Sequence, residues 1–321
     1  MRAAGRATRR PAVGAAVDLG SNSVHLLVAA VAAHRVEPLV DESVFLGLGD
    51  AVNQRGALGS VARGELVAAM VRYADAARRL GAASILFLGT EPLRRATDAD
   101  RIVDEGSAAA GAPVHVLSHE EEAYLTLIGV TDGRPVGHDM LVVDIGGGSS
   151  EFAVVAPGQP AAASGVQLGS ARLTGRHVTH DPPTADEVAA MSAEAREVLA
   201  AAPPASPREI VGVGGTASNL VKVLPAALLD RSLTRRRLAD IQAVLAAEPA
   251  DLAAERHVIN PVRARLLPAG GAIVEDILER YGVDRMRVSN ASLREGAILA
   301  EHHAGEAWRE LLPELAHGWR G

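Results

Sequence analysis

A short motif occurs twice in this chain. The first copy is residues 17–23, with the sequence VDLGSNS, and the second is residues 143–150, with the sequence VDIGGGSS. In each copy an apolar segment ends at an Asp, a turn of small residues follows, and a second apolar segment begins. The copies are separated by about the length of one domain. They therefore predict a duplicated fold in which two similar turns face one cleft.

Both turns carry groups suited to binding phosphate and metal. A Gly in a turn lets backbone N–H groups approach an anion with no Cβ in the way, and Ser and Asn side chains add further hydrogen-bonding groups. An Asp at the end of a strand can hold Mg²⁺ directly or through water. One such turn alone is equally consistent with an ordinary hairpin, whereas the pair favours a phosphate-binding site.

The composition limits the class of protein. The chain has 321 residues, enough for about two domains, and no cysteine, which excludes disulfides, Cys-ligated zinc and thiol nucleophiles. The net charge of −7 disfavours nucleic-acid binding, although local Arg clusters could still hold a polyanionic substrate. No run of 18 uncharged apolar residues occurs, so we expect no membrane partner and a cytoplasmic protein.

Predicted strands alternate with predicted helices in two similar halves, which favours an α/β fold with mixed sheets. Residues 1–12 are expected to be a disordered basic leader and residues 13–131 the first domain. A Gly-, Pro- and Asp-rich stretch then separates the halves. The second domain is expected at residues 132–303, with the option that its last helix packs back on the first. Residues 304–321 are expected to form a C-terminal tail.

Six sequence blocks, in a fixed order over about residues 14–300, resemble the exopolyphosphatase / guanosine pentaphosphate phosphohydrolase (Ppx/GppA) family of the actin-like ATPase superfamily. The blocks are residues 16–23, Gly89-Thr90 with Leu93-Arg94, Glu121-Glu122-Ala123 with Leu125 and Gly129-Val130, residues 144–151, residues 214–216, and Ser289 with residues 293–296. The resemblance implies duplicated actin-like (ribonuclease H-like) domains, with mixed sheets flanked by helices around a central cleft. It also implies the short, two-domain form of the family and a homodimer.

Three positions depart from the family's pattern. Glu91-Pro92 stands where other residues usually precede Leu93-Arg94. Phe45 stands where we expect an Arg before the Leu-Gly-x-Gly segment that starts at Leu46. Arg265 replaces the Asp that usually follows Arg-Ala. These departures concern loops around the predicted cleft.

The resemblance assigns the orientation of the attacking water to Glu122. The spacing of Ser118 and Glu121 predicts a capping box, so that Glu121 serves the helix terminus. Glu120 mainly complements the helix dipole. Glu122 is not needed for the cap and lies one helical turn before Thr126, on a face that could look into the cleft. Neighbouring carboxylates should raise its pKa, which suits a general base.

The remaining site residues divide into metal ligands and phosphate contacts. The predicted metal ligands are Asp144, Glu151 and Asp18, and Mg²⁺ (or Mn²⁺) is favoured over zinc because all three offer oxygen only. The hydroxyl of Thr90 and the guanidinium of Arg94 are expected at the cleft rim. A helix that begins at Gly214 should supply a further anion site at its N-terminus. The predicted phosphate contacts are Ser21, Asn22, Ser23, Thr90, Arg94, Gly146, Gly147, Gly148, Ser149, Ser150, Gly214, Gly215 and Thr216.

The leading functional prediction is a Mg²⁺-dependent phosphoanhydride hydrolase that releases terminal phosphate from inorganic polyphosphate, an exopolyphosphatase. The first alternative is the same chemistry on guanosine pentaphosphate, with loss of its 5′ γ-phosphate. A kinase or ATP-binding switch of the actin-like superfamily is a different class, but the chain has no sugar-site motif that we recognise. A catalytically silent sensor of nucleotide or polyphosphate is the remaining alternative.

Overall fold

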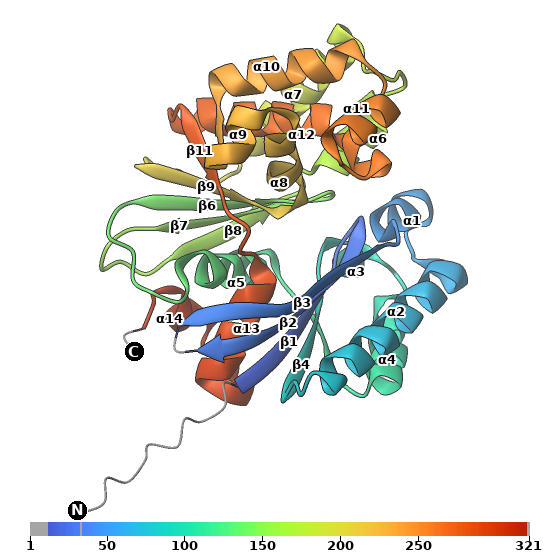
Figure 1. Ribbon diagram of the computed structural model, residues 1–321, viewed down its shortest axis with the longest axis vertical. Coiled ribbons are helices and arrows are strands. Elements are labelled where there is room, and N and C mark those ends of the chain that lie inside the picture. The colour runs from blue at the N-terminus through green and yellow to red at the C-terminus, as the bar shows by residue number, and fades with distance from the viewer. Residues whose placement is uncertain (1–11, 33, 320–321) are drawn as a thin grey trace, which may run out of the picture.

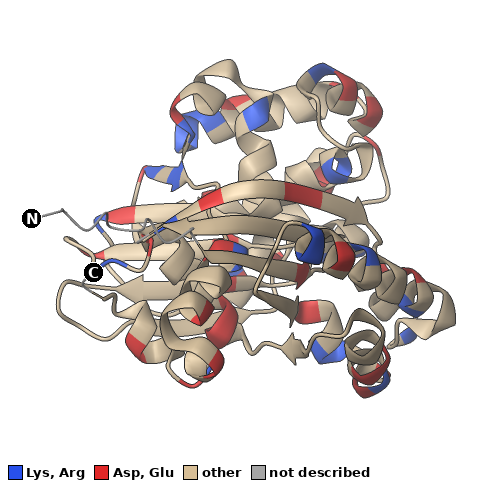
Figure 2. Cartoon of the chain, turned by 60° about the horizontal axis from the view of Figure 1, so that its bottom comes forward, with Lys and Arg blue, Asp and Glu red and all other residues tan. Residues whose placement is uncertain are grey.

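A computed structural model describes residues 12–32 and 34–319 (Figure 1). Residues 1–11, nearly all of the predicted basic leader, lie outside the described part. The chain folds into two lobes, each built on one β-sheet. In the described residues no helix combines the length and the apolar character needed to cross a bilayer. Positions of both charge signs are interspersed along the outer helices (Figure 2).

The sheet of the first lobe has the strand order β3-β2-β1-β4-β5. Its strands are β1 (Ala12–Leu19), β2 (Ser23–Ala32), β3 (Arg35–Phe45), β4 (Ser84–Gly89) and β5 (Val114–Val116). The first three strands form an antiparallel meander, and β4 and β5 run parallel to β1. β1 and β2 are nearly continuous apolar runs because both faces of the sheet are covered.

The sheet of the second lobe has the order β10-β11-β9-β6-β7-β8. Its strands are β6 (Met140–Ile145), β7 (Ser150–Val155), β8 (Ala162–Val166), β9 (Glu209–Val213), β10 (Ser232–Thr234) and β11 (Arg285–Val288). Without the edge strand β10, this sheet repeats the first one: three antiparallel strands are followed by two strands parallel to the first of them. The predicted duplication and the mixed sheets are confirmed.

Helices fill the layers outside and between the sheets. The helices of the first lobe are α1 (Leu48–Arg55), α2 (Gly59–Arg79), α3 (Glu91–Arg95), α4 (Ala99–Ala110) and α5 (His119–Thr131). Those that follow β8 are α6 (Ser170–His177), α7 (Ala185–Leu199), α8 (Gly214–Val223), α9 (Pro225–Asp230), α10 (Arg235–Ala247), α11 (Ala250–His257), α12 (Pro261–Tyr281), α13 (Leu293–Ala304), a 3-10 helix η1 (Gly305–Trp308) and α14 (Leu312–Ala316). α1, α2 and α4 cover the outer face of the first sheet, and α6 to α12 cover the outer face of the second.

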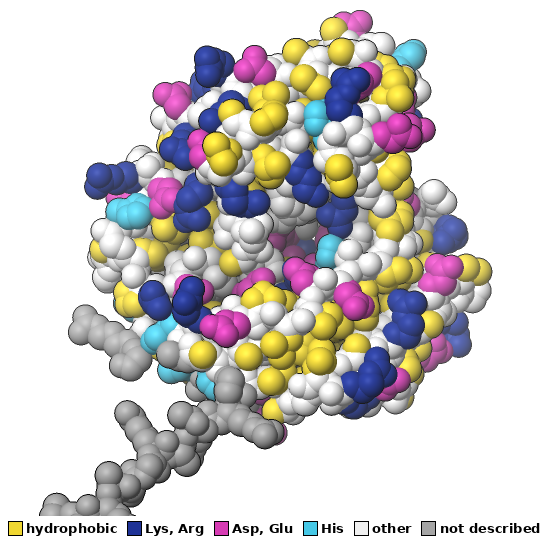
Figure 3. All heavy atoms as spheres, viewed as in Figure 1, with side chains coloured by type: hydrophobic (Ala, Val, Ile, Leu, Met, Phe, Trp, Pro, Cys, Tyr) yellow, Lys and Arg dark blue, Asp and Glu magenta, His cyan; other side chains and the backbone are white. Residues whose placement is uncertain are grey.

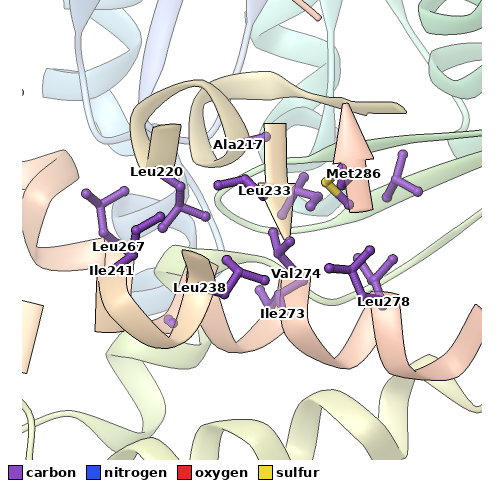
Figure 4. Packing of buried hydrophobic residues seen from close by; sticks show 14 of the residues in the cluster. Ala217, Leu220, Leu233, Leu238, Ile241, Leu267, Ile273, Val274, Leu278 and Met286 are labelled. Atoms are coloured by element: carbon purple, nitrogen blue, oxygen red, sulfur yellow. The ribbon is translucent and has the colours of Figure 1, made fainter. Parts of the chain in front are cut away.

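The core is built from aliphatic side chains, since aromatic residues make up only 2% of the sequence. Figure 4 shows part of the core above the second sheet, where side chains of three helices and two strands point toward one another. The labelled residues include Leu220 of α8, Leu238 of α10, Ile273 of α12, Leu233 of β10 and Met286 of β11. All five are fully buried. This packing fixes α8 and α12 over the second sheet.

α5 and α13 lie between the two sheets and cross in close contact (Figure 1). A Cβ on Gly296 would lie 1.8 Å from the carbonyl oxygen of Leu125, so only glycine allows this approach. α13 also packs on the first sheet, where Ile298 contacts Gly14 in β1. The helix that carries Glu122 therefore packs on the second sheet and is joined to the first sheet through α13.

The C-terminal segment belongs to the same central layer. Residues 304–319, expected to be a tail, contain η1 and α14, and Trp308 and Leu312 are buried in the core between the sheets. Helices this short carry too few apolar repeats to be predicted from periodicity. The domain limits at residues 13–131 and 132–303 stay a prediction.

Candidate active site

The two copies of the sequence motif form equivalent turns after β1 and β6. In the first turn the N–H of Gly20 donates to the carbonyl of Ser23 at 3.2 Å. In the second turn the N–H of Gly146 donates to the carbonyl of Ser149 at 3.0 Å. The Asp that precedes each turn is therefore held at the same place in its own lobe.

The turns lie against each other across the gap between the lobes. A Cβ on Gly147 would lie 2.8 Å from the side-chain amide nitrogen of Asn22. A Cβ on Gly148 would lie 2.5 Å from the carboxyl group of Glu91, at the start of α3. Side chains of the first lobe thus fill the space that these two glycines leave open.

A cleft of about 560 Å³ opens where the turns meet. Figure 3 shows it as a hollow between the lobes, with acidic side chains visible inside and Lys and Arg side chains gathered on the upper rim. Most of the predicted site residues line it. They are Asp18, Ser21, Asn22, Ser23, Thr90, Glu122, Asp144, Gly146, Gly147, Gly148, Ser149, Glu151, Gly214, Gly215 and Thr216.

Three hydroxyl groups predicted to bind phosphate donate to protein acceptors instead. Ser21 donates to Glu91 at 3.0 Å, Thr90 donates to a backbone carbonyl of β1 at 3.2 Å, and Ser150 donates to the carbonyl of Leu168 at 2.7 Å. A hydroxyl has one proton, so these oxygens offer only lone pairs to a ligand. Ser150 is moreover fully buried and is not among the residues that line the cleft. Phosphate donors must therefore come mainly from backbone N–H groups and other side chains.

Carboxyl groups gather at the floor of the cleft. Asp144 in β6 and Glu151 in β7 are direct cross-strand partners. Burial raises the pKa of Asp144 to about 8, with smaller contributions from the charges of Glu151 and Asp18. Burial, opposed in part by Arg294 and reinforced by Glu151, raises the pKa of Asp18 to about 6. The protein holds these groups close together without enough positive charge to balance them.

Glu122 lies in the first turn of α5 and is only 5% exposed, at the cleft wall. The predicted capping box is confirmed: Ser118 accepts from the N–H of Glu121, and the Glu121 side chain accepts from the N–H of Ser118. Glu121 is also held by Arg309 at 2.9 Å. Burial and the charge of Glu151 raise the pKa of Glu122 well above its ordinary value.

Arg94 lies behind the carboxylates and is not among the residues that line the cleft, where it was predicted to bind phosphate. It donates to Glu122 and lies 3.5 Å from Glu151. His119 completes the group, with Nδ1 2.8 Å from Glu151 Oε1 and 3.1 Å from Arg94 Nη2. Arg94 therefore opposes the rise in the pKa of Glu122 and fixes both glutamates in place.

The acidic floor fits a divalent cation. Asp18 Oδ1 is buried and has no hydrogen-bond partner among the described residues. Burial, reinforced by neighbouring carboxylates, raises the pKa values of Asp18 and Asp144, and a bound cation would favour their ionised forms. Within residues 12–32 and 34–319, no three Asp, Glu or His side chains are close enough to form a metal site by themselves. Water or substrate oxygens would have to complete the ligand set, as is usual for Mg²⁺.

The N-terminus of α8 closes one side of the cleft. Gly214 has a φ of 85°, and a Cβ there would lie 2.3 Å from Asp144 Oδ1, so both the backbone and the space require glycine. The next glycine lies against the guanidinium of Arg263, 3.0 Å from the position of its missing Cβ. Thr216 donates to Ser170 at 3.2 Å. The N-terminus of α8 thus lies beside both the acidic floor and the guanidinium of Arg263.

Sequence reasoning missed three residues at this site. Arg263, from α12, lines the cleft and donates to Ser23 at 3.2 Å. Glu91 and Arg172 form a buried ion pair of 2.7 Å beside the glycine turn. Each comes from a segment far along the chain from the motif it contacts, so local spacing carries no signal for it. The family resemblance marked Glu91 only as a departure from the family's sequence pattern and assigned it no role.

The other departures lie away from the acidic floor. Pro92 occupies the first turn of α3, a position that tolerates proline because its missing N–H has no helical partner. Phe45 is 38% exposed at the end of β3 and packs beside Gly47. Arg265 lies 3.9 Å from Asp181, outside the residues that line the cleft.

The chain matches known proteins over nearly its whole length. The family model of the Ppx/GppA phosphatase family matches residues 27–304. "Exopolyphosphatase 1" of Mycobacterium tuberculosis is 29% identical over 302 residues, which cover 88% of this chain and 86% of that protein.

Solved structures agree with this match. The Aquifex aeolicus PPX-GPPA enzyme superposes with a TM-score of 0.75 at 25% identity, over 90% of this chain and 99% of that one. An exopolyphosphatase from Cytophaga hutchinsonii superposes with a TM-score of 0.77 at 24% identity, over 88% and 96% of the two chains, which supports the fold.

Proposed function

The chain belongs to the Ppx/GppA phosphatase family, a family of phosphoanhydride hydrolases, and we propose that it is a Mg²⁺-dependent exopolyphosphatase. The observation that carries this proposal is the position of Glu122. It is a buried carboxylate with a raised pKa at the wall of a cleft, opposite two phosphate-binding turns and beside further carboxylates. A general base near a bound anion needs this combination of proton affinity and shielding from water.

In the proposed reaction a water molecule attacks the terminal phosphorus atom of polyphosphate. A P–O bond to the water oxygen forms, and the P–O bond to the bridging oxygen breaks, so that the products are phosphate and a chain one unit shorter. Glu122 accepts the proton of the water, and Arg94, which donates to it, opposes the rise in its pKa and orients the carboxylate. Backbone N–H groups of Gly147 and Gly148 hold the terminal phosphate, while the N–H of Gly146 closes the turn on the carbonyl of Ser149.

Asp18, Asp144 and Glu151 would hold the cation, which we propose to be Mg²⁺ or Mn²⁺. When bound, it would neutralise the negative charge that substrate and carboxylates bring together in the cleft. Arg263 and the N-terminus of α8 offer positive charge for the phosphates beyond the scissile bond.

A second substrate is favoured by the apolar part of the cleft. Leu266 and Leu293 line it together with Arg263. An apolar wall next to a cation suits a nucleotide, so guanosine pentaphosphate is the alternative, with loss of its 5′ γ-phosphate. A catalytically silent sensor of the same ligands is the remaining alternative. The family resemblance adds a homodimer and a cytoplasmic location to the proposal, without a nucleic-acid or membrane partner.

Purified protein with Mg²⁺ should be assayed for phosphate release from polyphosphates of several lengths, guanosine pentaphosphate and ATP. Release from polyphosphate supports the exopolyphosphatase, and its dependence on length measures how far the cleft extends. Release only from guanosine pentaphosphate supports the alternative. If no substrate is hydrolysed although polyphosphate or nucleotide binds, the protein is a sensor. Light scattering of the same sample tests the dimer.

A further inference from the structure

Glu91 is a buried carboxylate that neither the reaction nor the proposed metal site uses. It starts α3 in the first lobe, is 3% exposed, and lies at the wall of the cleft. Its two oxygens accept from three side chains: Ser21 at 3.0 Å, Arg95 at 2.6 Å and Arg172 at 2.7 Å. A carboxylate beside a phosphate-binding turn weakens anion binding unless its charge is compensated, so its presence requires an explanation.

One of these partners belongs to the other lobe. Arg172 lies in α6, is 7% exposed, and uses its guanidinium twice: Nη2 donates to Glu91, and Nε donates to the carbonyl of Gly148 at 2.8 Å. The first contact crosses between the lobes, and the second fixes the glycine turn of its own lobe. Arg172 therefore joins the glycine turn to α3.

Glu91 makes the matching connection in the first lobe. It accepts a hydrogen bond from the hydroxyl of Ser21, a residue of the first turn, and its carboxyl group fills the space over Gly148 of the second turn. The chain Ser21–Glu91–Arg172–Gly148 thus links the two turns through three hydrogen bonds. Both charged members are buried, where an ion pair resists separation because either partner alone would be an uncompensated charge.

We propose that Glu91 and Arg172 form a clasp that holds the two phosphate-binding turns at a fixed separation before any substrate binds. Both are positioning residues and not catalytic ones, because they act through Ser21 and Gly148. This inference rests on the proposed function for its kinetic consequence. The clasp itself is a property of the unliganded protein and can be tested without any substrate.

Arg95 provides a matched control. It donates to the same oxygen of Glu91, Oε1, but from the same helix, one turn further on, and it also donates to Asn53 in α1. Arg95→Met removes a guanidinium from Glu91 without breaking any contact between the lobes. Arg172→Met removes the bridge, while the backbone N–H of residue 172 still donates to the carbonyl of Gly147.

The decisive experiment is hydrogen–deuterium exchange of the unliganded protein, followed over the peptides that contain residues 20–23 and 146–149. Arg172→Met should speed exchange in both turns by about tenfold, the usual scale for breaking one buried contact pair. Arg95→Met should change exchange there by less than about twofold. The conservative E91Q, which keeps the shape and the Ser21 contact, should fall between them. If Arg172→Met does not fold, E91Q against Arg95→Met makes the same comparison.

Equal exchange in the Arg172→Met and Arg95→Met proteins would overturn the clasp, as would faster exchange in the second turn alone, since a clasp must loosen both. In the assay for phosphate release, a loosened clasp should raise KM more than it lowers kcat, because the turns must then be ordered by the substrate. A protein that shows the exchange pattern but hydrolyses nothing keeps the clasp and refutes only the proposed function.

Discussion

Asp144 and Glu151 face each other across the β6–β7 hairpin, two residues before and two residues after the glycine-rich turn. This register puts two carboxylates at the mouth of one glycine-rich turn. The first lobe has the same hairpin, but there the partner of Asp18 is His25. The lobes are therefore duplicated in backbone but differ in charge at this cross-strand position, where the second lobe has two carboxylates and the first has a carboxylate and an imidazole.

The acidic floor predicts that stability falls as the pH rises. An unfolded Asp titrates near 3.8, and Asp144 titrates near 8 in the fold. The proton that the folded state retains between these values stabilises it, so this stability is complete below about pH 4 and is lost toward pH 8. Asp144→Asn should raise the Tm of metal-free protein at pH 8 by about 2 °C for each kcal/mol regained.

The measurement is thermal unfolding in EDTA at pH 5 and pH 8. The gain from Asp144→Asn should be larger at pH 8. Asp139→Asn, which changes an Asp outside the cleft lining, should give no comparable difference between the two pH values. A gain of the same size at both pH values would show that folding does not raise the pKa of Asp144.

Added metal should restore the stability that the protein loses as Asp144 ionises at higher pH. Ligand carboxylates must be ionised to bind a cation, so Mg²⁺ binding should strengthen with pH. At a concentration 100 times its Kd, a cation that binds only the folded state stabilises it by about 2.7 kcal/mol. The Tm increase caused by Mg²⁺ should therefore be larger at pH 8 than at pH 5, and it should be absent in Asp144→Asn. NaCl at equal ionic strength is the control, and a matching increase with NaCl would remove the argument for a specific site.

Gly214 should not tolerate a side chain. Gly214→Ala forces an Ala into a φ of 85° and places its Cβ 2.3 Å from Asp144 Oδ1. Gly282→Ala imposes a similar φ, 63°, at a position where no atom lies within 4 Å of the new Cβ. The control should lose about 1 kcal/mol from backbone strain alone. Gly214→Ala should lose more stability than Gly282→Ala in urea unfolding and also lose phosphatase activity; equal losses with full activity would show that α8 can move away from Asp144.

The sequence predicted the parts of the site whose signals are local. The two turns, the flanking Asp residues and the capping box at Ser118 are each encoded within a few residues, and the cap distinguishes Glu121 from Glu122. The duplication then implied that the turns face one cleft. These local features could therefore be predicted from the sequence, while the chemical roles of their residues stay a prediction.

Contacts between distant segments could not be read in this way. Glu91 and Arg172 are 81 positions apart, and Arg263 reaches Ser23 from 240 positions away. The same limit applies to Arg94, which was predicted from its sequence position to bind phosphate. Its guanidinium instead meets carboxylates of α5 and β7, which only the packing of α5 on the second sheet brings close.

The most direct measurement of the central claim is phosphate release from polyphosphate by the wild-type protein and by Glu122→Gln. Glu120→Gln is the matched control, because Glu120 is exposed, lies two residues before Glu122 on the same helix, and is not among the residues that line the cleft. A general base contributes about 10²–10⁴-fold to the rate, so Glu122→Gln should reduce kcat at least a hundredfold while polyphosphate binding is largely retained. Glu120→Gln should keep wild-type turnover. Unchanged turnover in Glu122→Gln, with wild-type protein active, would contradict the account at its centre.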